Sequence, residues 1–129
     1  MSSVALLAEV IYTPERRIEN GCVLIEGRSI RAVGKRTEIA IPPACQTYEL
    51  GNDILVPGFV DVHVHGAGGR DVMEAGREAL AAIGQTLRRH GTTAYLATTV
   101  TAPVDETLRV LEALSVAIKA TRAEASSLQ

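Results

Sequence analysis

The sequence predicts an α/β protein, in which a module of short strands over residues 1–57 precedes alternating strands and helices over residues 58–129. Three observations support this fold class. Turn-forming residues divide the first part into short apolar runs. In the second part, strand-like runs alternate with segments whose apolar residues recur at helical spacing. The two parts meet in a valine-rich run that ends in histidines and glycines, ILVPGFVDVHVHGAGG, which is typical of a strand with a site at its carboxyl end.

Short strands separated by turn signals fill the first part. The strands are predicted at residues 4–12, 22–26, 30–33, 47–50 and 54–56. Asn20-Gly21 is a dipeptide typical of hairpin turns, and residues 27–29 and 51–53 predict further turns. We therefore expect an antiparallel meander. A module of this size buries only a modest core, so it needs a second layer to pack against.

Strand, helix, strand and helix follow one another in the second part. The strands are predicted at residues 59–65 and 93–98, and the helices at residues 74–90 and from Pro103 onward. The first helix carries Leu80, Ile83 and Leu87 on one face and ends at Gly91. A strand–helix–strand unit predicts a parallel pair with a right-handed crossover, which places His63 and His65 at the carboxyl edge of the sheet.

The second helix has a start signal and an apolar pattern. Pro103 suits the first helical position, and Asp105 and Glu106 lie in the first turn, where the helix dipole favours negative charge. The buried stripe is predicted at Val104, Leu108, Leu111 and Ile118.

The histidine pair is the candidate metal site. In a strand, side chains two residues apart point to the same face, so the imidazoles of His63 and His65 should project together. The opposite face, formed by Val60, Val62 and Val64, should be buried against helices. Asp61 shares the face of the histidines and could orient a metal-ligating side chain without binding the metal itself. A structural hydrogen bond is nevertheless the favoured interpretation of Asp61.

Other residues near the pair carry weaker signals. His90 is expected to end the first helix rather than to act in catalysis. Gly66, Gly68 and Gly69 could let the backbone approach a substrate or could permit tight turning, and the sequence leaves both roles open. The threonines that end the second strand, among them Thr98, receive no role.

Composition excludes several classes of function. The chain has 13 Lys and Arg against 15 Asp and Glu, with a net charge of −2, so it offers no basic surface for nucleic acid or anionic membranes. No apolar run is long enough to span a membrane. The opening residues lack a basic signal-peptide region, which favours a cytoplasmic protein. Cys22 and Cys45 form no metal-binding or redox pattern and are interpreted as structural thiols.

Two blocks of sequence resemble a known family. The run LVPGFVDVHVHGAGG, its continuation RDVM, and the later block HGTTAYLATTVT are similar to the amino-terminal part of the N-acetylglucosamine-6-phosphate deacetylases, within the metal-dependent amidohydrolase superfamily. The resemblance covers nearly the whole chain. It implies the first two βα units of a TIM-like (β/α)8 barrel, preceded by part of a small β-sandwich. The implied reaction is hydrolysis of N-acetylglucosamine 6-phosphate to glucosamine 6-phosphate and acetate.

The resemblance also implies roles for particular residues. His63 and His65 match the metal ligands of the first barrel strand. Because some members of this family replace these histidines and keep one metal ion, their presence here favours a site able to hold a second one. The implied cofactor is a divalent ion, zinc or iron, with one or two per complete site. The implied complete enzyme is a homodimer that binds an amino-sugar phosphate.

The remaining parts of the implied active site are missing from the sequence. The family's further metal ligands, its general base and its substrate-binding residues would all follow residue 129. Two imidazoles are fewer than the three protein ligands of a catalytic zinc. We therefore expect this chain to be a fragment that is inactive alone. Two alternatives remain open, namely another amidohydrolase such as a dihydroorotase-like cyclic amidase, and a non-enzymatic association module.

Overall fold

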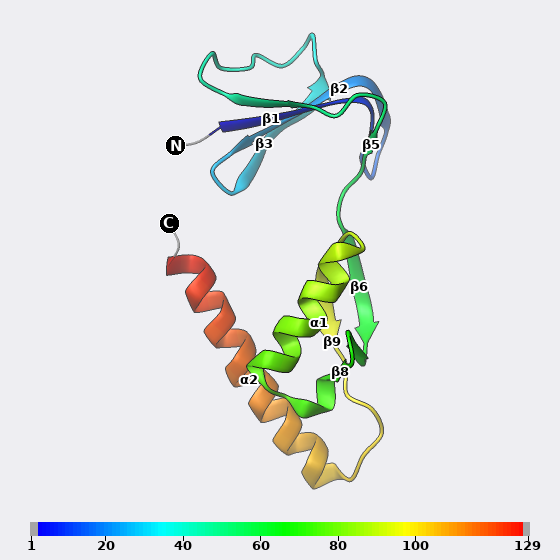
Figure 1. The fold of residues 1–129 in the computed structure, drawn as a ribbon, viewed down its shortest axis with the longest axis vertical. Helices are drawn as coiled ribbons and strands as arrows, with labels where there is room; N and C mark the ends of the chain where they lie inside the picture. Colours follow the sequence, from blue (N-terminus) through cyan, green and yellow to red (C-terminus); the bar gives the residue numbers. More distant parts are fainter. Residues whose placement is uncertain (1–2, 128–129) are drawn as a thin grey trace. The chain divides into compact units, whose positions relative to one another are not determined.

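The computed structural model describes residues 3–127, and the chain divides into two compact units, Met1–Pro57 and Gly58–Gln129 (Figure 1). The first unit is built from strands alone. Its strands are β1 (Ser3–Tyr12), β2 (Arg17–Glu26), β3 (Ser29–Lys35), β4 (Gln46–Glu49) and β5 (Ile54–Leu55). The predicted short strands of this part are therefore confirmed, although β2 begins earlier than the sequence pattern indicates.

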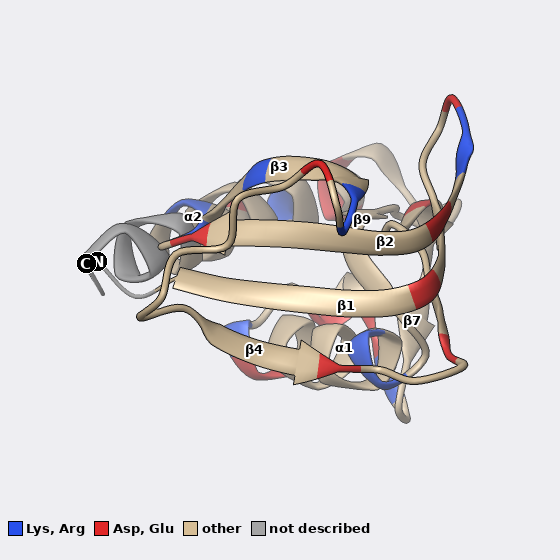
Figure 2. Cartoon of the chain, turned by 90° about the horizontal axis from the view of Figure 1, so that it is seen from above, with Lys and Arg blue, Asp and Glu red and all other residues tan. Residues whose placement is uncertain are grey.

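The first unit forms one sheet with β1 near its centre. The strand order is β3-β2-β1-β4 (Figure 2). In addition, β5 pairs with the far end of β1. The pairs β1–β2 and β2–β3 are antiparallel, which confirms the meander. By contrast, β4 and β5 return parallel to β1. The loop that contains Pro42-Pro43 supplies the crossover that a parallel return requires.

Both faces of this sheet bury apolar residues in two small clusters. The clusters consist of Ala5, Leu7, Cys22 and Leu24, and of Ala8, Ile11, Ile18 and Val23. Cys22 is fully buried, and this burial raises the pKa of its thiol. Cys45 packs against the edge of the first cluster, and both cysteines are free. The interpretation of both residues as structural thiols is consistent with this packing.

The Asn20-Gly21 dipeptide lies inside β2 and does not form the predicted hairpin turn. The chain reverses instead before β2, where the hydroxyl of Thr13 accepts hydrogen bonds from the backbone N–H groups of Glu15 and Arg16. Asn20 adopts a left-handed backbone with φ of 47°, which asparagine tolerates. A Cβ at Gly21 would collide with the side chain of Ile11. The dipeptide thus serves close packing within the sheet.

The second unit combines strands and helices. Its elements are β6 (Phe59–Val64), β7 (Gly66–Ala67), β8 (Arg70–Asp71), η1 (Val72–Glu74), α1 (Arg77–Arg89), β9 (Thr92–Ala97) and α2 (Val104–Ser127). Strands β6 and β9 are parallel and are connected through α1, which confirms the predicted strand–helix–strand unit. Helix α1 packs on β9, and the hydroxyl of Tyr95 donates a hydrogen bond to the carbonyl of Leu80 at 3.2 Å.

Helix α1 begins at Arg77, three residues later than predicted. The residues from Val72 form a separate 3-10 turn, because Asp71 and Glu74 cap it with reciprocal hydrogen bonds to the backbone. Ala75 then has a φ of 53°, which interrupts the helical path. At the other end the prediction is confirmed, since His90 is the C-cap residue and Gly91 has a φ of 85°.

The buried stripe of α2 differs from the predicted one. Val104 is 76% exposed, and Leu108, Leu111 and Ile118 are also exposed. The buried residues are Val110, Leu114 and Ala117. Apolar residues occur on more than one side of this helix, so spacing alone could not select the face that packs.

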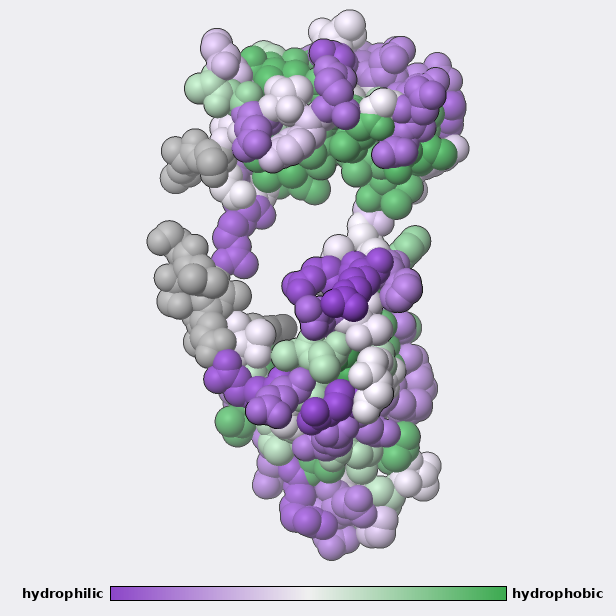
Figure 3. Space-filling view, in the orientation of Figure 1, coloured by the Kyte–Doolittle hydropathy of each residue, from purple (hydrophilic) through white to green (hydrophobic). Residues whose placement is uncertain are grey.

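The valine face of β6 is likewise buried only in part. Val60 and Val62 are 64% and 65% exposed, whereas Val64 is buried with Val72 and Ile83. The register of the β6–β9 pairing shifts between Asp61 and Val64, and only Val64 joins the core of the unit. The second unit therefore leaves apolar residues of β6, β9 and α2 exposed. Figure 3 shows hydrophobic residues, in green, among hydrophilic ones on the visible face of the molecule.

No helix within residues 3–127 combines the length and the apolar character that a membrane span requires.

Candidate metal site

The two histidines of the candidate site face each other at the carboxyl end of β6. His63 lies in the strand and His65 directly follows it. Their Nε2 atoms are 2.9 Å apart, and the ring centroids are 4.7 Å apart with the ring planes perpendicular. The imidazoles thus project together, as the two-residue spacing on a strand predicts. Both rings are accessible from solvent.

Thr98, which directly follows the neighbouring strand β9, supports one of these rings. The Nδ1 atom of His65 lies 3.0 Å from the backbone carbonyl oxygen of Thr98 and 3.3 Å from its hydroxyl. The backbone N–H of Thr98 in turn donates to the carbonyl of Val64 at 2.9 Å. Sequence reasoning assigned no role to Thr98. The signal that could have found it is the parallel pairing, because the carboxyl ends of β6 and β9 lie side by side.

Asp61 has a local structural contact. Its Oδ1 atom accepts a hydrogen bond from the backbone N–H of His63 at 3.1 Å. This contact agrees with the favoured interpretation of Asp61 as a structural hydrogen-bonding residue. It fixes the backbone of the first histidine rather than its ring.

A tight hairpin follows the histidines and requires glycine. The backbone N–H of Val72 donates to the carbonyl of His65 at 2.7 Å, which closes the β7–β8 hairpin back on the site. A Cβ at Gly66 would collide with the carbonyl oxygen of Arg70. Gly68 has a φ of 63°, and a Cβ there would collide with the hydroxyl of Thr86. Tight turning, one of the two roles left open, therefore accounts for both of these glycines.

An ion pair holds the hairpin to the turn that follows it. The guanidinium of Arg70 lies 2.8 Å from the carboxylate of Glu74, whose other oxygen accepts a hydrogen bond from the backbone N–H of Asp71 at 2.7 Å. The hydrogen bond from Asp71, followed by the contact with Arg70, holds the pKa of Glu74 below its ordinary value.

This pKa shift predicts the direction of a pH effect. A carboxyl group with a lowered pKa in the folded state stabilises that state above its unfolded pKa and ceases to do so as pH falls through the folded pKa. We expect the hairpin to loosen below the ordinary range of glutamate pKa values, and Glu74→Gln to abolish that pH dependence. The protection of the Asp71 amide from hydrogen exchange, measured as a function of pH, reports this effect. A Glu74→Gln variant with the same pH profile as the wild type would refute this role of Glu74.

The donor set fits a metal ion in part. Two nitrogens that bind one zinc ion at about 2.0–2.1 Å in tetrahedral geometry lie roughly 3.3 Å apart. The Nε2 atoms of His63 and His65, at 2.9 Å, are close to this separation. Within the residues that the structure describes, however, no group of three or more His, Cys, Asp or Glu side chains could hold a metal ion. The pair by itself offers two nitrogen donors, fewer than the three protein ligands of a catalytic zinc site.

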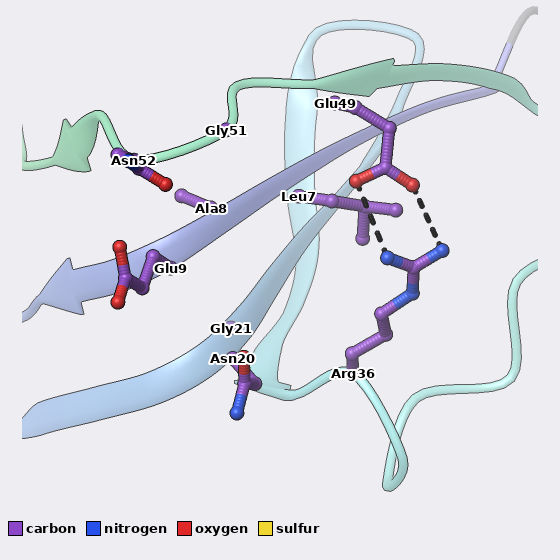
Figure 4. A pocket seen from close by; sticks show the side chains of 9 residues that line it. All are labelled: Leu7, Ala8, Glu9, Asn20, Gly21, Arg36, Glu49, Gly51 and Asn52. Atoms are coloured by element: carbon purple, nitrogen blue, oxygen red, sulfur yellow. Dashed lines mark hydrogen bonds and ion pairs between the residues drawn. The ribbon is translucent and has the colours of Figure 1, made fainter.

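A separate pocket of about 320 Å³ lies in the first unit and offers less chemistry. Arg36 and Glu49 line it and form an ion pair of 2.8 Å across its edge (Figure 4). Among the described residues that line the pocket, the only cationic side chain is thus already paired with Glu49, and the remaining charged group is the carboxylate of Glu9. The pocket carries no histidine or cysteine, so the histidine pair remains the candidate site.

Comparisons with known proteins agree with one another. The sequence profile of the Amidohydrolase family matches residues 54–128, which is more than half of the chain. The N-acetylglucosamine-6-phosphate deacetylase of Bacillus subtilis is 35% identical over 103 residues, which are 78% of this chain and 26% of that protein. The enzyme of the same name from Vibrio furnissii is 45% identical over 71 residues, 55% of this chain and 16% of that one.

Solved structures show the same likeness. An N-acetyl-D-glucosamine-6-phosphate deacetylase of Mycobacterium smegmatis, in complex with N-acetyl-D-glucosamine-6-phosphate, is 32% identical with a TM-score of 0.82 over 93% of this chain and 30% of that one. The Pasteurella multocida N-acetylglucosamine-6-phosphate deacetylase, at 24% identity and a TM-score of 0.81, shares the fold. The chain thus spans about a quarter of the Bacillus subtilis relative and less of the Vibrio furnissii one. Because the family profile covers most of it, the chain belongs to the amidohydrolase family.

Proposed function

We propose that the complete protein is a metal-dependent hydrolase that removes the acetyl group from N-acetylglucosamine 6-phosphate, giving glucosamine 6-phosphate and acetate. The observation that carries the proposal is the histidine pair, whose Nε2 atoms converge at the end of β6. Its support is the membership in the amidohydrolase family, whose members are generally metal-dependent, and the similarity to deacetylases over 78% of the chain.

Under this proposal, residues 58–129 form the first two βα units of a TIM-like barrel, and residues 1–57 form part of a β-sandwich. The parallel pair β6–β9 with its connecting helix supports the first assignment. A group at the carboxyl end of such strands faces the active site of a barrel. The sheet of the first unit, with apolar residues on both faces, supports the second.

In this function His63 and His65 would both act as metal ligands. Each would hold a divalent ion, zinc or iron, through its Nε2 atom, and Thr98 and Asp61 would fix the ring of one and the backbone of the other. When bound, such an ion lowers the pKa of a water molecule and polarises the amide carbonyl. The further ligands and the general base belong to other residues of the complete protein, since the described residues offer no third ligand beside the pair.

The proposal is tested by acetate release from the complete protein. With N-acetylglucosamine 6-phosphate, we expect turnover that a chelator abolishes and that added zinc or iron restores. N-acetylgalactosamine 6-phosphate is the second candidate substrate, because a deacetylase named for it in Escherichia coli O157:H7 is 40% identical over 52 residues. Dihydroorotate serves as the control for a cyclic amidase. Hydrolysis of dihydroorotate without release of acetate from either sugar phosphate would refute the proposal.

A further inference from the structure

We propose that Thr98 is a positioning residue, which fixes His65 in the tautomer that carries its proton on Nδ1 and so makes Nε2 its metal-binding atom. The role in metal binding rests on the proposed function. The tautomer itself rests only on the contacts of the protein, so the two can be tested apart.

The carbonyl group of Thr98 decides where the proton of His65 lies. A carbonyl oxygen can only accept a hydrogen bond, and it lies 3.0 Å from Nδ1 of His65. In a neutral imidazole one ring nitrogen is a donor and the other an acceptor. Nδ1 must therefore be the donor, and Nε2 keeps its lone pair. The hydroxyl of Thr98, at 3.3 Å from the same nitrogen, is a second and weaker acceptor.

This arrangement sets the opposite tautomer on His63 when no metal ion is bound. The two Nε2 atoms are 2.9 Å apart, a distance at which one of them must donate a proton to the other. Because Nε2 of His65 holds a lone pair, Nε2 of His63 is the donor. An ion between the two rings would take the place of that proton. As a neutral ligand His63 would then carry its proton on Nδ1, whereas His65 would stay as it is.

The strand pairing holds the carbonyl of Thr98 in place. The backbone N–H of Thr98 donates to the carbonyl of Val64 at 2.9 Å, and Val64 is only 5% exposed. Val64 also pairs with Ala97 in the parallel ladder. The acceptor therefore sits on a rigid part of the fold rather than on a mobile side chain, which is how outer contacts orient metal-binding histidines in other proteins.

Histidine nitrogen resonances test the proposal in the metal-free protein. Long-range proton–nitrogen spectra, recorded well above the ordinary histidine pKa of about 6.5, distinguish a protonated from an unprotonated ring nitrogen. We expect His65 with its proton on Nδ1 and His63 with its proton on Nε2. A proton on Nε2 of His65, or equal amounts of both tautomers, would overturn the proposal, whatever the metal content of the complete enzyme.

Two altered proteins distinguish the effect of the Thr98 carbonyl on the tautomer of His65 from that of the Thr98 hydroxyl. Thr98→Val removes the hydroxyl and keeps the shape and the carbonyl, so His65 should keep its tautomer. Replacing the amide between Thr98 and Thr99 by an ester weakens the carbonyl as an acceptor, so His65 should lose its preference and zinc affinity should fall about tenfold. Thr99→Val is the matched control and should match the wild type. An ester variant with an unchanged tautomer would contradict the assignment.

Zinc chloride alone distinguishes this inference from the proposed function. Addition of zinc should move the proton of His63 away from Nε2 and leave Nδ1 of His65 protonated. If zinc also displaced the proton on Nδ1 of His65, then Nδ1 rather than Nε2 would be the metal-binding atom, and the inference would fail. Failure of the complete protein to release acetate, with these spectra as expected, would refute only the proposed function.

Discussion

Replacement of His65 by glutamine is expected to lower the metal content of the complete protein by about one ion per chain. The reason is that Nε2 of His65 and Nε2 of His63 converge at 2.9 Å on a common point, so removal of either nitrogen leaves a single imidazole there. Loss of only an outer partner of a metal ligand costs about 10–100-fold in metal affinity or activity. Loss of the ligand itself should therefore weaken binding of that ion by more than about 100-fold.

Metal analysis and acetate release measure this effect together. His63→Gln should behave as His65→Gln does, because each ring supplies one of the two nitrogens. His90→Gln is the matched control, since His90 is the chain's remaining histidine and lies at the C-cap of α1. If the control lost metal as readily as the two variants, or if the variants kept their full metal content, the histidine pair would not be a metal site.

Replacement of Ile83 by alanine is expected to destabilise the second unit by about 2–5 kcal/mol. Ile83 is fully buried on α1 and packs in one cluster with Val64, Val72, Val110 and Leu114. This cluster joins α1 and α2 to the end of β6, directly before His65. The cavity left by the lost side chain would have no neighbour able to fill it without moving a strand or a helix.

Loss of helical circular dichroism in denaturant measures this stability, because both α-helices of the described residues belong to the second unit. Val104→Ala is the control: Val104 is 76% exposed in the first turn of α2, and its replacement should change stability by less than about 0.5 kcal/mol. If Ile83→Ala and Val104→Ala lost equal stability, Ile83 would not be a stabilising core residue of the second unit.

The sequence predicted most of the elements because each has a local signal. Apolar runs, turn residues and the helix end at Gly91 locate β1, β3, β6, β9 and the end of α1. The position of the histidines at a strand end followed from the same signals. The start of α1 did not, because the capping box between Asp71 and Glu74 forms a separate turn that resembles a helix start in sequence.

Contacts between segments distant in sequence explain the remaining differences. The packed face of α2 depends on which residues meet Val64 and Ile83, and its apolar pattern fits more than one face. Thr98 contacts His65 across 33 positions of sequence, through a backbone atom that every residue type possesses. No residue pattern marks such a contact. Only the parallel pairing of β6 with β9 brings the two together.

The most direct test of the metal site is anomalous diffraction from crystals of the complete protein at the absorption edge of the bound metal. The proposed function predicts a peak at about 2.0–2.1 Å from Nε2 of both His63 and His65. A metal ion bound elsewhere in a fully active protein, with both Nε2 atoms free, would contradict it.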